Sequence, residues 1–337
     1  MEKLCIVGTG SWGTTLAVLF SRQGLNVSLW ARTLDEATAL NVRRENVEFL
    51  PGIPFPLTLH VTADLEAALR DARTVLVVVP AQTFRANVKR LRELVTPEQI
   101  VVSATKGIEL DSLQRMTEIV RAELPQLPPE RTAVLSGPNI AREIAAGLPA
   151  TTVVACTDDD VARAVQEQLL SPSFRVYTHH DVVGVELAGA LKNVIAIVAG
   201  VADGFGVGDN AKAAVLTRGL AEISRLGVVL GANPLTFMGL AGIGDLLCTC
   251  NSCHSRNHSV GEQLAQGQTL EQIVSGTKMV AEGVTTTQAA RALAARHQVE
   301  MPLLEQVYQV LFEGKAPRQA IGDLLLREAK REFYGFG

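Results

Sequence analysis

Along the first half of the chain, short and wholly apolar runs alternate with longer amphipathic stretches. Runs such as Val75–Val79 are apolar at every position, a pattern typical of parallel strands that helices cover on both faces. Comparable runs predict further strands at Lys3–Val7, Asn26–Trp30, Ile100–Ser103, Ala133–Ser136, Thr152–Ala155 and Arg175–Thr178. The stretches between them predict helices, among them Ser11–Arg22, Thr83–Leu94 and Asp158–Leu169. Repeated strand–helix units predict an α/β domain built on an open parallel sheet.

From about Val182 the strand pattern stops and helical periodicity takes over. Helices are expected at Val182–Asp203, Asn210–Leu226, Gly261–Ala265, Glu282–His297 and Pro302–Phe312. A chain of 337 residues is also longer than one ordinary hydrophobic core requires. The sequence therefore predicts two domains: a doubly wound α/β domain over residues 1–180 and an all-helical domain over residues 181–337.

Composition narrows the classes of partner. A net charge of −4 does not give the overall positive charge that favours binding to nucleic acid or to an anionic membrane. The uncharged run Leu226–Gly244 contains Asn233-Pro234 and several glycines, so we expect no membrane insertion there. Five cysteines and a start without the apolar core of a secretory peptide favour a reducing, cytoplasmic location. The oligomeric state stays open, with a homodimer as the candidate assembly.

The first predicted strand runs directly into a glycine-rich turn. Gly8-Thr9-Gly10-Ser11-Trp12-Gly13 fits the G-x-G-x-x-G pattern and opens an apolar helix, which is the context that a Rossmann-like dinucleotide site requires. Gly8 permits the tight turn, Gly10 lets the backbone approach a pyrophosphate, and Gly13 lets helix and strand pack closely. The alternative is a tight turn without a ligand.

The end of the second strand bears on which dinucleotide binds. An acidic residue there would bind the ribose 2′-hydroxyl and repel a 2′-phosphate. This chain has Arg32 instead, whose planar guanidinium suits a phosphate or the face of an adenine. Asp35 and Glu36 follow and are candidates for the start of a helix. We therefore expect NADP(H), NAD(H) or both as cofactor.

The predicted helix from Val182 carries charge only at Glu186 and Lys192 over its first 21 residues. At about 100° per residue, its large apolar side chains fall on one side. Glu186, Lys192 and Asn193 fall on the other, among small residues such as Gly189 and Gly200. Small neighbours suggest room for a ligand, and a lysine in such a pocket can donate or accept a proton. The alternative is a half-buried helix whose Lys192 pairs with a surface carboxylate.

Seven stretches together carry a resemblance. They are Gly8-Thr9-Gly10-Ser11-Trp12-Gly13, Ser103-Ala104-Thr105-Lys106-Gly107-Ile108-Glu109, Leu135-Ser136-Gly137-Pro138, Gly189-Ala190-Leu191-Lys192-Asn193, Gly242-Ile243-Gly244-Asp245-Leu246, Ser255-Arg256-Asn257 and Glu282-Gly283. In this order they resemble the bacterial NAD(P)-dependent glycerol-3-phosphate dehydrogenases. The resemblance implies a two-domain enzyme that reduces dihydroxyacetone phosphate to sn-glycerol 3-phosphate, the precursor of glycerophospholipids.

The resemblance also implies roles for individual residues. Cofactor contacts carried over by position are Ser11, Trp12, Arg32, Lys106, Ala141, Arg256, Val280 and Glu282. Substrate neighbours are Lys106, Gly137, Asn139, Lys192, Asp245, Ser255, Arg256 and Asn257. Lys192 matches the family's proton donor and acceptor, with Lys106 to stabilise charge on the C2 oxygen and Asp245 to bind a hydroxyl or orient a lysine. Arg256 and its neighbours would bind the phosphate.

The chain departs from the family at two places. Position 139 is Asn where Ser or Thr is usual, which puts its substrate contact in doubt. Cys248-Thr249-Cys250-Asn251-Ser252-Cys253-His254 is an unusual cluster that could ligate zinc, although it lacks separated C-x₂-C pairs. We interpret these cysteines as packing thiols and expect no metal.

Three alternatives to this dehydrogenase remain at the level of sequence. They are a related β-hydroxyacid dehydrogenase, a catalytically silent dinucleotide sensor, and a zinc-dependent structural module based on the cysteine cluster.

Overall fold

The computed structural model describes residues 3–275, 281–329 and 331–332. Contacts within the chain divide it into two compact units. The sheet unit comprises Met1–Thr105 and Met116–Val182, and the helical unit comprises Lys106–Arg115 and Val183–Gly337. The segment 106–115 therefore groups with the helical unit, although it lies inside the range expected for the first domain.

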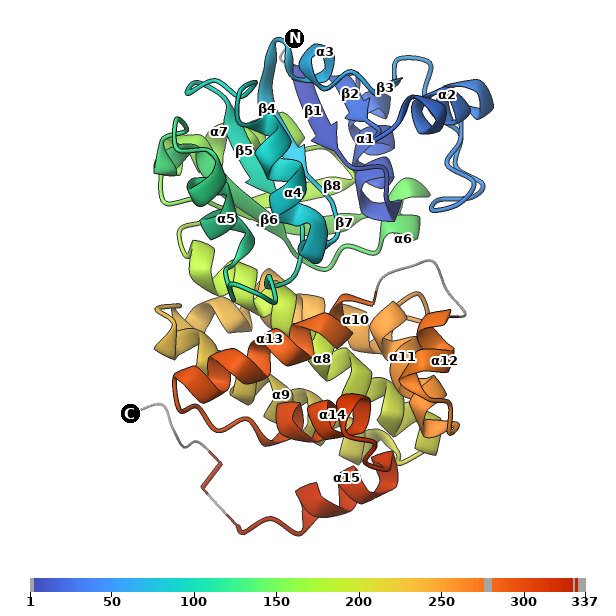
Figure 1. Cartoon of the computed structure of the whole chain (residues 1–337), viewed down its shortest axis with the longest axis vertical. Coiled ribbons are helices and arrows are strands. Elements are labelled where there is room, and N and C mark those ends of the chain that lie inside the picture. The colour runs from blue at the N-terminus through green and yellow to red at the C-terminus, as the bar shows by residue number, and fades with distance from the viewer. Residues whose placement is uncertain (1–2, 276–280, 330, 333–337) are drawn as a thin grey trace. The chain divides into compact units, whose positions relative to one another are not determined.

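The sheet unit contains one eight-stranded sheet in the order β3-β2-β1-β4-β5-β6-β7-β8 (Figure 1). The strands are β1 (Lys3–Val7), β2 (Asn26–Trp30), β3 (His60–Thr62), β4 (Ala72–Val77), β5 (Ile100–Ser103), β6 (Thr132–Ser136), β7 (Ala150–Ala155) and β8 (Phe174–His179). Neighbouring strands are parallel except β6 and β7, which are antiparallel. The prediction of an open parallel sheet was wrong at this pair, because an apolar run does not reveal the direction of its strand.

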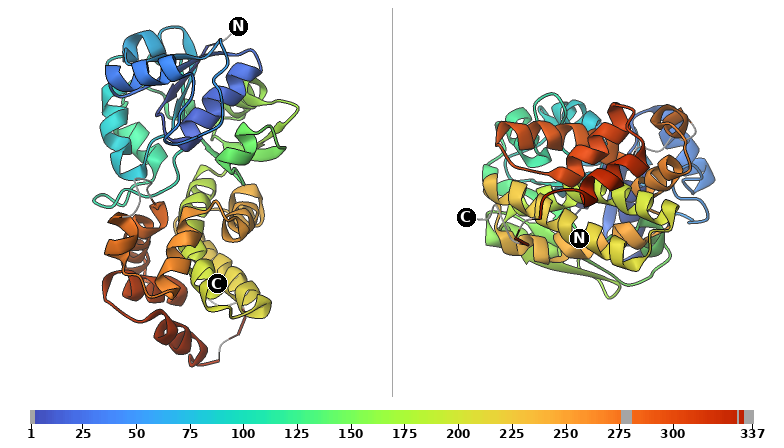
Figure 2. Two further views of the ribbon diagram at one scale, coloured as in Figure 1. Left: turned by 90° about the vertical axis from the view of Figure 1, so that its right-hand side faces the viewer. Right: turned by 90° about the horizontal axis from the view of Figure 1, so that it is seen from below.

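Helices lie on both faces of this sheet, as the left view of Figure 2 shows. They are α1 (Ser11–Arg22), α2 (Leu34–Arg43), α3 (Leu65–Leu69), α4 (Ala81–Leu91), α5 (Met116–Glu123), α6 (Ala141–Ala145) and α7 (Asp159–Leu169). Alternate residues of β1 belong to different cores: Leu4 and Ile6 pack in one cluster, Cys5 and Val7 in another. Burial on both faces explains why the strand sequences are continuously apolar.

The helical unit surrounds one long buried helix. Its elements are α8 (Val182–Phe205), α9 (Asp209–Val229), α10 (Asp245–Asn251), α11 (Arg256–Ala265), α12 (Leu270–Ser275), α13 (Glu282–Arg296), α14 (Pro302–Phe312) and α15 (Pro317–Leu325), with a π-helical turn at Leu240–Gly244. α8 runs through this unit with other helices around it (Figures 1 and 2). It is the one helix in the described residues that is long and apolar enough to cross a membrane, but 89% of its most apolar window is buried in the protein, as in a core helix.

Two glycines let α11 pack directly on α8. A Cβ on Gly200 would lie 1.9 Å from the carbonyl oxygen of His258, and a Cβ on Gly261 would lie 2.0 Å from that of Ile197. At Gly200, the small residue predicted to leave room for a ligand therefore serves helix packing. α11 also begins at Arg256 rather than at Gly261, because the Ser255 hydroxyl caps it by accepting from the backbone N–H of His258.

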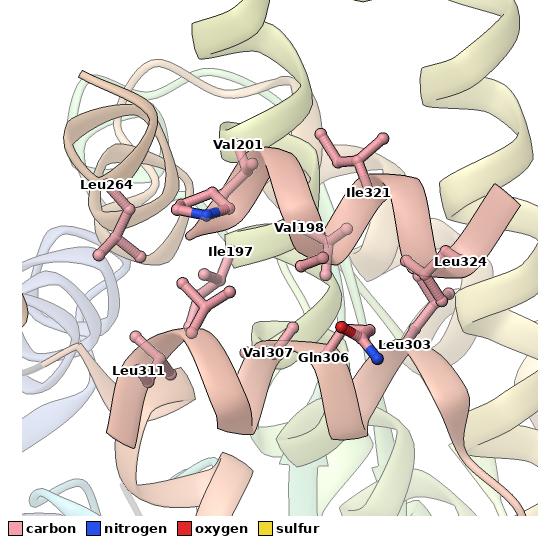
Figure 3. A pocket seen from close by; sticks show the side chains of 13 residues that line it. Ile197, Val198, Val201, Leu264, Leu303, Gln306, Val307, Leu311, Ile321 and Leu324 are labelled. Atoms are coloured by element: carbon pink, nitrogen blue, oxygen red, sulfur yellow. The ribbon is translucent and has the colours of Figure 1, made fainter. Parts of the chain in front are cut away.

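A small apolar cavity of about 40 Å³ lies between α8, α11, α14 and α15 (Figure 3). Its lining is Ile197, Val198, Val201, Leu264, Leu303, Gln306, Val307, Val310, Leu311, Pro317, Ala320, Ile321 and Leu324. Ligand pockets measure roughly 300–1,000 Å³, so this cavity is a packing gap and does not hold a substrate.

A buried carboxylate on α9 anchors α14. Glu222 is 3% exposed and accepts hydrogen bonds from the backbone N–H groups of Leu303 and Leu304 in the first turn of α14. Burial raises the pKa of Glu222 from 4.5 to about 7, against the effect of those hydrogen bonds. The folded state therefore binds this proton more tightly than the unfolded state does.

Glu222 is predicted to make stability fall as pH rises. Because its folded pKa lies above the unfolded value, the unfolding free energy is highest below pH 4.5 and falls towards pH 7. The difference in unfolding free energy between Glu222→Gln and wild type should therefore grow in favour of the variant, by on the order of 2–3 kcal/mol from pH 4.5 to pH 8. Urea titrations at each pH measure this difference. The exposed Glu93→Gln is the control. A difference between Glu222→Gln and wild type that does not change with pH would contradict the prediction.

Candidate active site

The glycine loop between β1 and α1 has one glycine that the protein's own packing does not explain. A Cβ on Gly8 (φ +120°) would lie 2.3 Å from the Val78 carbonyl oxygen, and one on Gly13 would lie 2.0 Å from that of Gly8. A Cβ on Gly10 would meet no atom within 4 Å. Gly10 sits at the N-terminus of α1, where helix N–H groups can bind an anion. This open glycine is what a bound pyrophosphate requires, so the residues present fit a dinucleotide.

Side chains from outside the motif fix this loop. The Asn46 amide donates to the Thr9 carbonyl oxygen at 2.7 Å, and Thr14 Oγ1 donates to the same oxygen at 3.0 Å. The Thr9 hydroxyl donates to the Glu36 carboxylate. Ser11 and Trp12, predicted cofactor contacts, are the first two residues of α1 and are partly buried.

The end of β2 carries a cation and a carboxylate together. Arg32 is exposed two residues after β2, and its backbone N–H donates to Glu36 Oε2 at 3.2 Å. Glu36 lies in the first turn of α2, as predicted, and its own N–H donates to the cap residue Thr33. Its carboxylate nevertheless turns back towards the glycine loop. A carboxylate therefore lies beside the glycine loop, four residues after Arg32.

The remaining candidates of the sheet unit follow β6. Gly137 has φ +155°, and a Cβ there would lie 2.9 Å from Thr152 Cα. The Asn139 amide is bonded at both ends: it donates to the Thr151 carbonyl oxygen at 2.9 Å and accepts from the Thr152 hydroxyl at 3.0 Å. Ala141 begins α6, and its carbonyl oxygen accepts from Thr15 Oγ1 of α1 at 3.2 Å. The structure thus links Ala141 to the helix that follows the glycine loop.

In the helical unit, Lys192, Lys106 and Asp245 come together as one group. Lys192 and Asp245 are 4% and 1% exposed. The Lys192 ammonium donates to Asp245 Oδ1 and to the Thr249 hydroxyl, and the Lys106 ammonium lies 2.5 Å from Asp245 Oδ2. The alternative in which Lys192 pairs with a surface carboxylate was therefore wrong, since its partner is buried.

This environment lowers the pKa of Lys192. Burial lowers its pKa from 10.5 to about 8; the negative charge of Asp245 opposes this shift and the positive charge of Lys106 adds to it. A lysine with such a pKa exchanges a proton readily near neutral pH. Thr249, on the next turn of α10, completes its hydrogen bonds and was not found from the sequence.

The segment Ser255–Asn257 forms the start of α11 and plays two parts. Arg256 is partly buried, and burial lowers its pKa while the negative charge of Glu282 raises it. The Asn257 amide donates to Asn193 Oδ1 at 3.0 Å and accepts from the Gly283 backbone N–H at 2.9 Å. Asn257 thereby ties α11 to α8 and α13, while Arg256 supplies the cation. Predicted contact Val280 lies outside the described residues.

The cysteine cluster does not form a metal site in the part of the chain that the structure describes. No three His, Cys, Asp or Glu side chains there come together in a way that could hold a metal ion. Cys250 is buried, which raises its pKa to about 12 and disfavours the thiolate that zinc needs. His258 pairs instead with Asp203, Nε2 to Oδ2, at 2.7 Å.

A sheet unit whose glycine loop fits a dinucleotide, together with a helical unit that holds a buried lysine of lowered pKa, is typical of the class of NAD(P)-dependent dehydrogenases. Comparison with known families specifies the class further. Residues 3–162 match the NAD-dependent glycerol-3-phosphate dehydrogenase N-terminus, and residues 181–322 match the C-terminus of the same family. The chain belongs to this family, and it is an oxidoreductase.

Individual relatives agree with this assignment. Proteins named glycerol-3-phosphate dehydrogenase [NAD(P)+] from Pelotomaculum thermopropionicum and Streptomyces coelicolor are each 48% identical over 330 residues, covering 98% of this chain and 95% and 98% of theirs. The crystal structure of glycerol-3-phosphate dehydrogenase from Coxiella burnetii matches with a TM-score of 0.92 and 38% identity, covering 97% of this chain and 99% of that one. These findings favour the dehydrogenase over the β-hydroxyacid and sensor alternatives.

Gly10 and Gly13 are predicted to respond differently to the same substitution. Gly10→Ala should leave the melting temperature of the nucleotide-free protein near the wild-type value but weaken dinucleotide binding about tenfold or more, because the methyl group obstructs a pyrophosphate. Gly13→Ala should lower the melting temperature, because its Cβ collides with the Gly8 carbonyl oxygen. Calorimetric titration with NADH and NADPH measures the binding.

Gly322→Ala is the matched control, since a Cβ at this glycine in α15 also meets no atom within 4 Å. Unchanged nucleotide affinity in Gly10→Ala would contradict the assignment of Gly10.

Proposed function

We propose that this enzyme interconverts dihydroxyacetone phosphate and sn-glycerol 3-phosphate, with Lys192 as the group that donates and accepts the proton. The observation that carries the proposal is the buried Lys192 ammonium, bonded to the Asp245 carboxylate and with its pKa lowered to about 8. Membership of the family supports this choice of substrate. The contacts within the helical unit support the roles proposed for its residues.

The nicotinamide cofactor, when bound, supplies the hydride for carbon C2 of the substrate. Residues of the sheet unit that would hold it are Gly8, Gly10, Ser11, Trp12, Gly13, Arg32 and Ala141. Residues of the helical unit proposed to contact it are Lys106, Arg256 and Glu282. The support in the structure is the open backbone at Gly10 beside the N-terminus of α1.

During reduction, negative charge develops on the C2 oxygen. Lys192 stabilises that charge and transfers its proton to the oxygen, and Lys106 adds a second positive charge. Asp245 holds both ammonium groups, so neither lysine has to reorient when the charge appears. In the oxidation direction, neutral Lys192 removes the proton from the C2 hydroxyl.

The start of α11 carries the groups that we propose bind the phosphate of the substrate. The Arg256 guanidinium and the helix N–H groups beside Ser255 are suited to a dianion. Asn257 holds this turn in place through Asn193 and Gly283. Gly137 and Asn139 stay proposed substrate neighbours; the Asn139 side chain is already bonded to Thr151 and Thr152. In this proposal the enzyme works in the cytoplasm and supplies the backbone of glycerophospholipids.

Turnover and its pH dependence test the role of Lys192. Purified protein should oxidise NADPH or NADH when dihydroxyacetone phosphate is added, and Lys192→Met should lower the rate by about 10²- to 10⁴-fold. Above pH 7, kcat/KM for glycerol 3-phosphate oxidation should rise through about pH 8, because the base must be neutral. For reduction, kcat/KM should fall over the same range, because the acid must be protonated.

Lys315→Met is the matched control, since Lys315 lies in the same unit and contacts Gln306, Gln309 and Asp323. Dihydroxyacetone without its phosphate is the control substrate and should react poorly. No turnover by wild type that binds NADPH would exclude this substrate. Turnover that survives in Lys192→Met would exclude Lys192 as the proton donor.

Arg32 and Glu36 are predicted to pull the cofactor preference in opposite directions. Glu36→Gln should raise the NADPH-to-NADH ratio of kcat/KM, because a carboxylate repels a 2′-phosphate and accepts from a 2′-hydroxyl. Arg32→Ala should lower the ratio. We expect changes of about fivefold, the equivalent of roughly 1 kcal/mol of charge interaction. Asp35→Asn, the adjacent exposed carboxylate, is the control, and equal ratios in all three variants would contradict the assignment.

A further inference from the structure

The segment that carries Lys106 is held in the helical unit by noncovalent contacts. Residues 106–115 lie in the chain between β5 and α5, both of which belong to the sheet unit, yet their contacts are with the helical unit. The segment folds back on itself: Ile108 and Arg115 form an antiparallel bridge, and the Glu109 N–H donates to the Gln114 carbonyl oxygen at 3.0 Å. Lys106 therefore depends on whatever fastens this hairpin.

The contacts that hold the hairpin include apolar and ionic ones, and Leu110 and Leu113 pack against the core of the helical unit. Ile108 is fully buried in the core of the helical unit. At the other end, Arg115 Nη1 donates to Glu186 Oε2 of α8 at 2.5 Å, with the side chains 15% and 4% exposed. Taking two charges out of water costs free energy that their attraction often does not repay, so a buried pair is weak evidence of stabilisation. The Arg115–Glu186 pair is therefore better explained by a role in positioning the segment 106–115 than by a contribution to the stability of the fold.

We propose that the Arg115–Glu186 ion pair is a positioning device that holds the hairpin 106–115 on α8 and so keeps the Lys106 ammonium against Asp245. The proposal rests on the function proposed above, because Lys106 matters as a partner of Lys192 and Asp245. Glu186 and Lys192 stand on the same helix, so the pair fixes Lys106 relative to the helix that carries the proton donor.

The pH dependence of the reaction reports the position of Lys106. The groups that face Lys192 are Asp245, Thr249 and Cys248 from α10, and Lys106 from the hairpin. The positive charge of Lys106 lowers the pKa of Lys192, so moving Lys106 away raises it. Removing the negative charge of Glu186 has by itself the opposite effect and lowers it. The direction of the shift therefore separates displacement of Lys106 from direct loss of the Glu186 charge.

The experiment measures kcat/KM for glycerol 3-phosphate oxidation against pH in wild type, Glu186→Gln, Lys106→Gln and the double variant. In Glu186→Gln we expect the midpoint to move to higher pH by about half a unit or more and the plateau to fall about tenfold. Lys106→Gln should shift the midpoint in the same direction. The double variant should show no further upward shift beyond that of Lys106→Gln, because the displaced hairpin then carries no lysine, and the direct loss of the Glu186 charge can only lower its midpoint slightly.

Arg291→Met is the control for general destabilisation of the helical unit, since Arg291 pairs with Glu305 and stacks on Tyr308 away from this group. It should lower the melting temperature without moving the midpoint. Arg115→Lys keeps the charge but loses the planar fork, and it should give a smaller shift in the same direction. This variant tests the proposal if Glu186→Gln does not fold.

A midpoint that stays at the wild-type pH, or moves lower, in Glu186→Gln or Arg115→Lys would overturn the positioning role. Additive effects in the double variant would do the same. Failure of the proposed function has a different signature, because wild type itself would then show no turnover. In that case, an NMR titration of the Lys192 side chain in the same variants still measures the shift.

Discussion

The helical unit is organised around one carboxylate held between two ammonium groups where little water reaches. Asp245 is 1% exposed, with Lys192 on one oxygen and Lys106 on the other. Buried charges depend on their partners far more than exposed ones, because no solvent replaces a missing partner. Three segments far apart in sequence must therefore converge: α8 with Lys192, α10 with Asp245 and the hairpin with Lys106. Burial lowers the pKa of Lys192, the positive charge of Lys106 adds to that effect and the negative charge of Asp245 opposes it. The net positive charge of the trio suits an oxygen that becomes negative.

The three buried polar side chains of α8 each bind a different neighbouring segment. Glu186 binds Arg115 of the hairpin, Lys192 binds Asp245 of α10, and Asn193 accepts from Asn257 of α11. A helix buried in an apolar core can carry such residues only if each is fully bonded. Lys192, the proposed proton donor, and its polar neighbours on α8 therefore also hold the surrounding elements in place. Gly200 completes the arrangement by letting α11 approach the α8 backbone closely.

How much of this the sequence predicts depends on the range of the interaction. The apolar pattern and the glycine motif predicted β1 and α1 at their observed bounds, and the loop between them. Lys192 stood out because it is charged on an apolar helix. Its burial beside Asp245, 53 positions away, is a tertiary property that no local pattern encodes. The grouping of segment 106–115 with the helical unit and the turn of Glu36 towards Thr9 were missed for the same reason. The antiparallel β6–β7 pair was missed because apolar runs do not reveal strand direction.

The three glycines of the loop between β1 and α1 differ in what surrounds them. Gly8 and Gly13 are required by close backbone approach within the protein, whereas a side chain at Gly10 would meet no atom of the protein, and we propose that the cofactor approaches there. Asn46 and Thr14 hold the Thr9 carbonyl oxygen, so the loop is ordered before a ligand arrives. Preorganisation lowers the conformational entropy lost on binding, and affinity can then come from a few backbone N–H groups. In the proposal made above, Arg32 and Glu36 at the edge of the loop set the choice between NADH and NADPH, and Glu36 also bonds to the loop through Thr9.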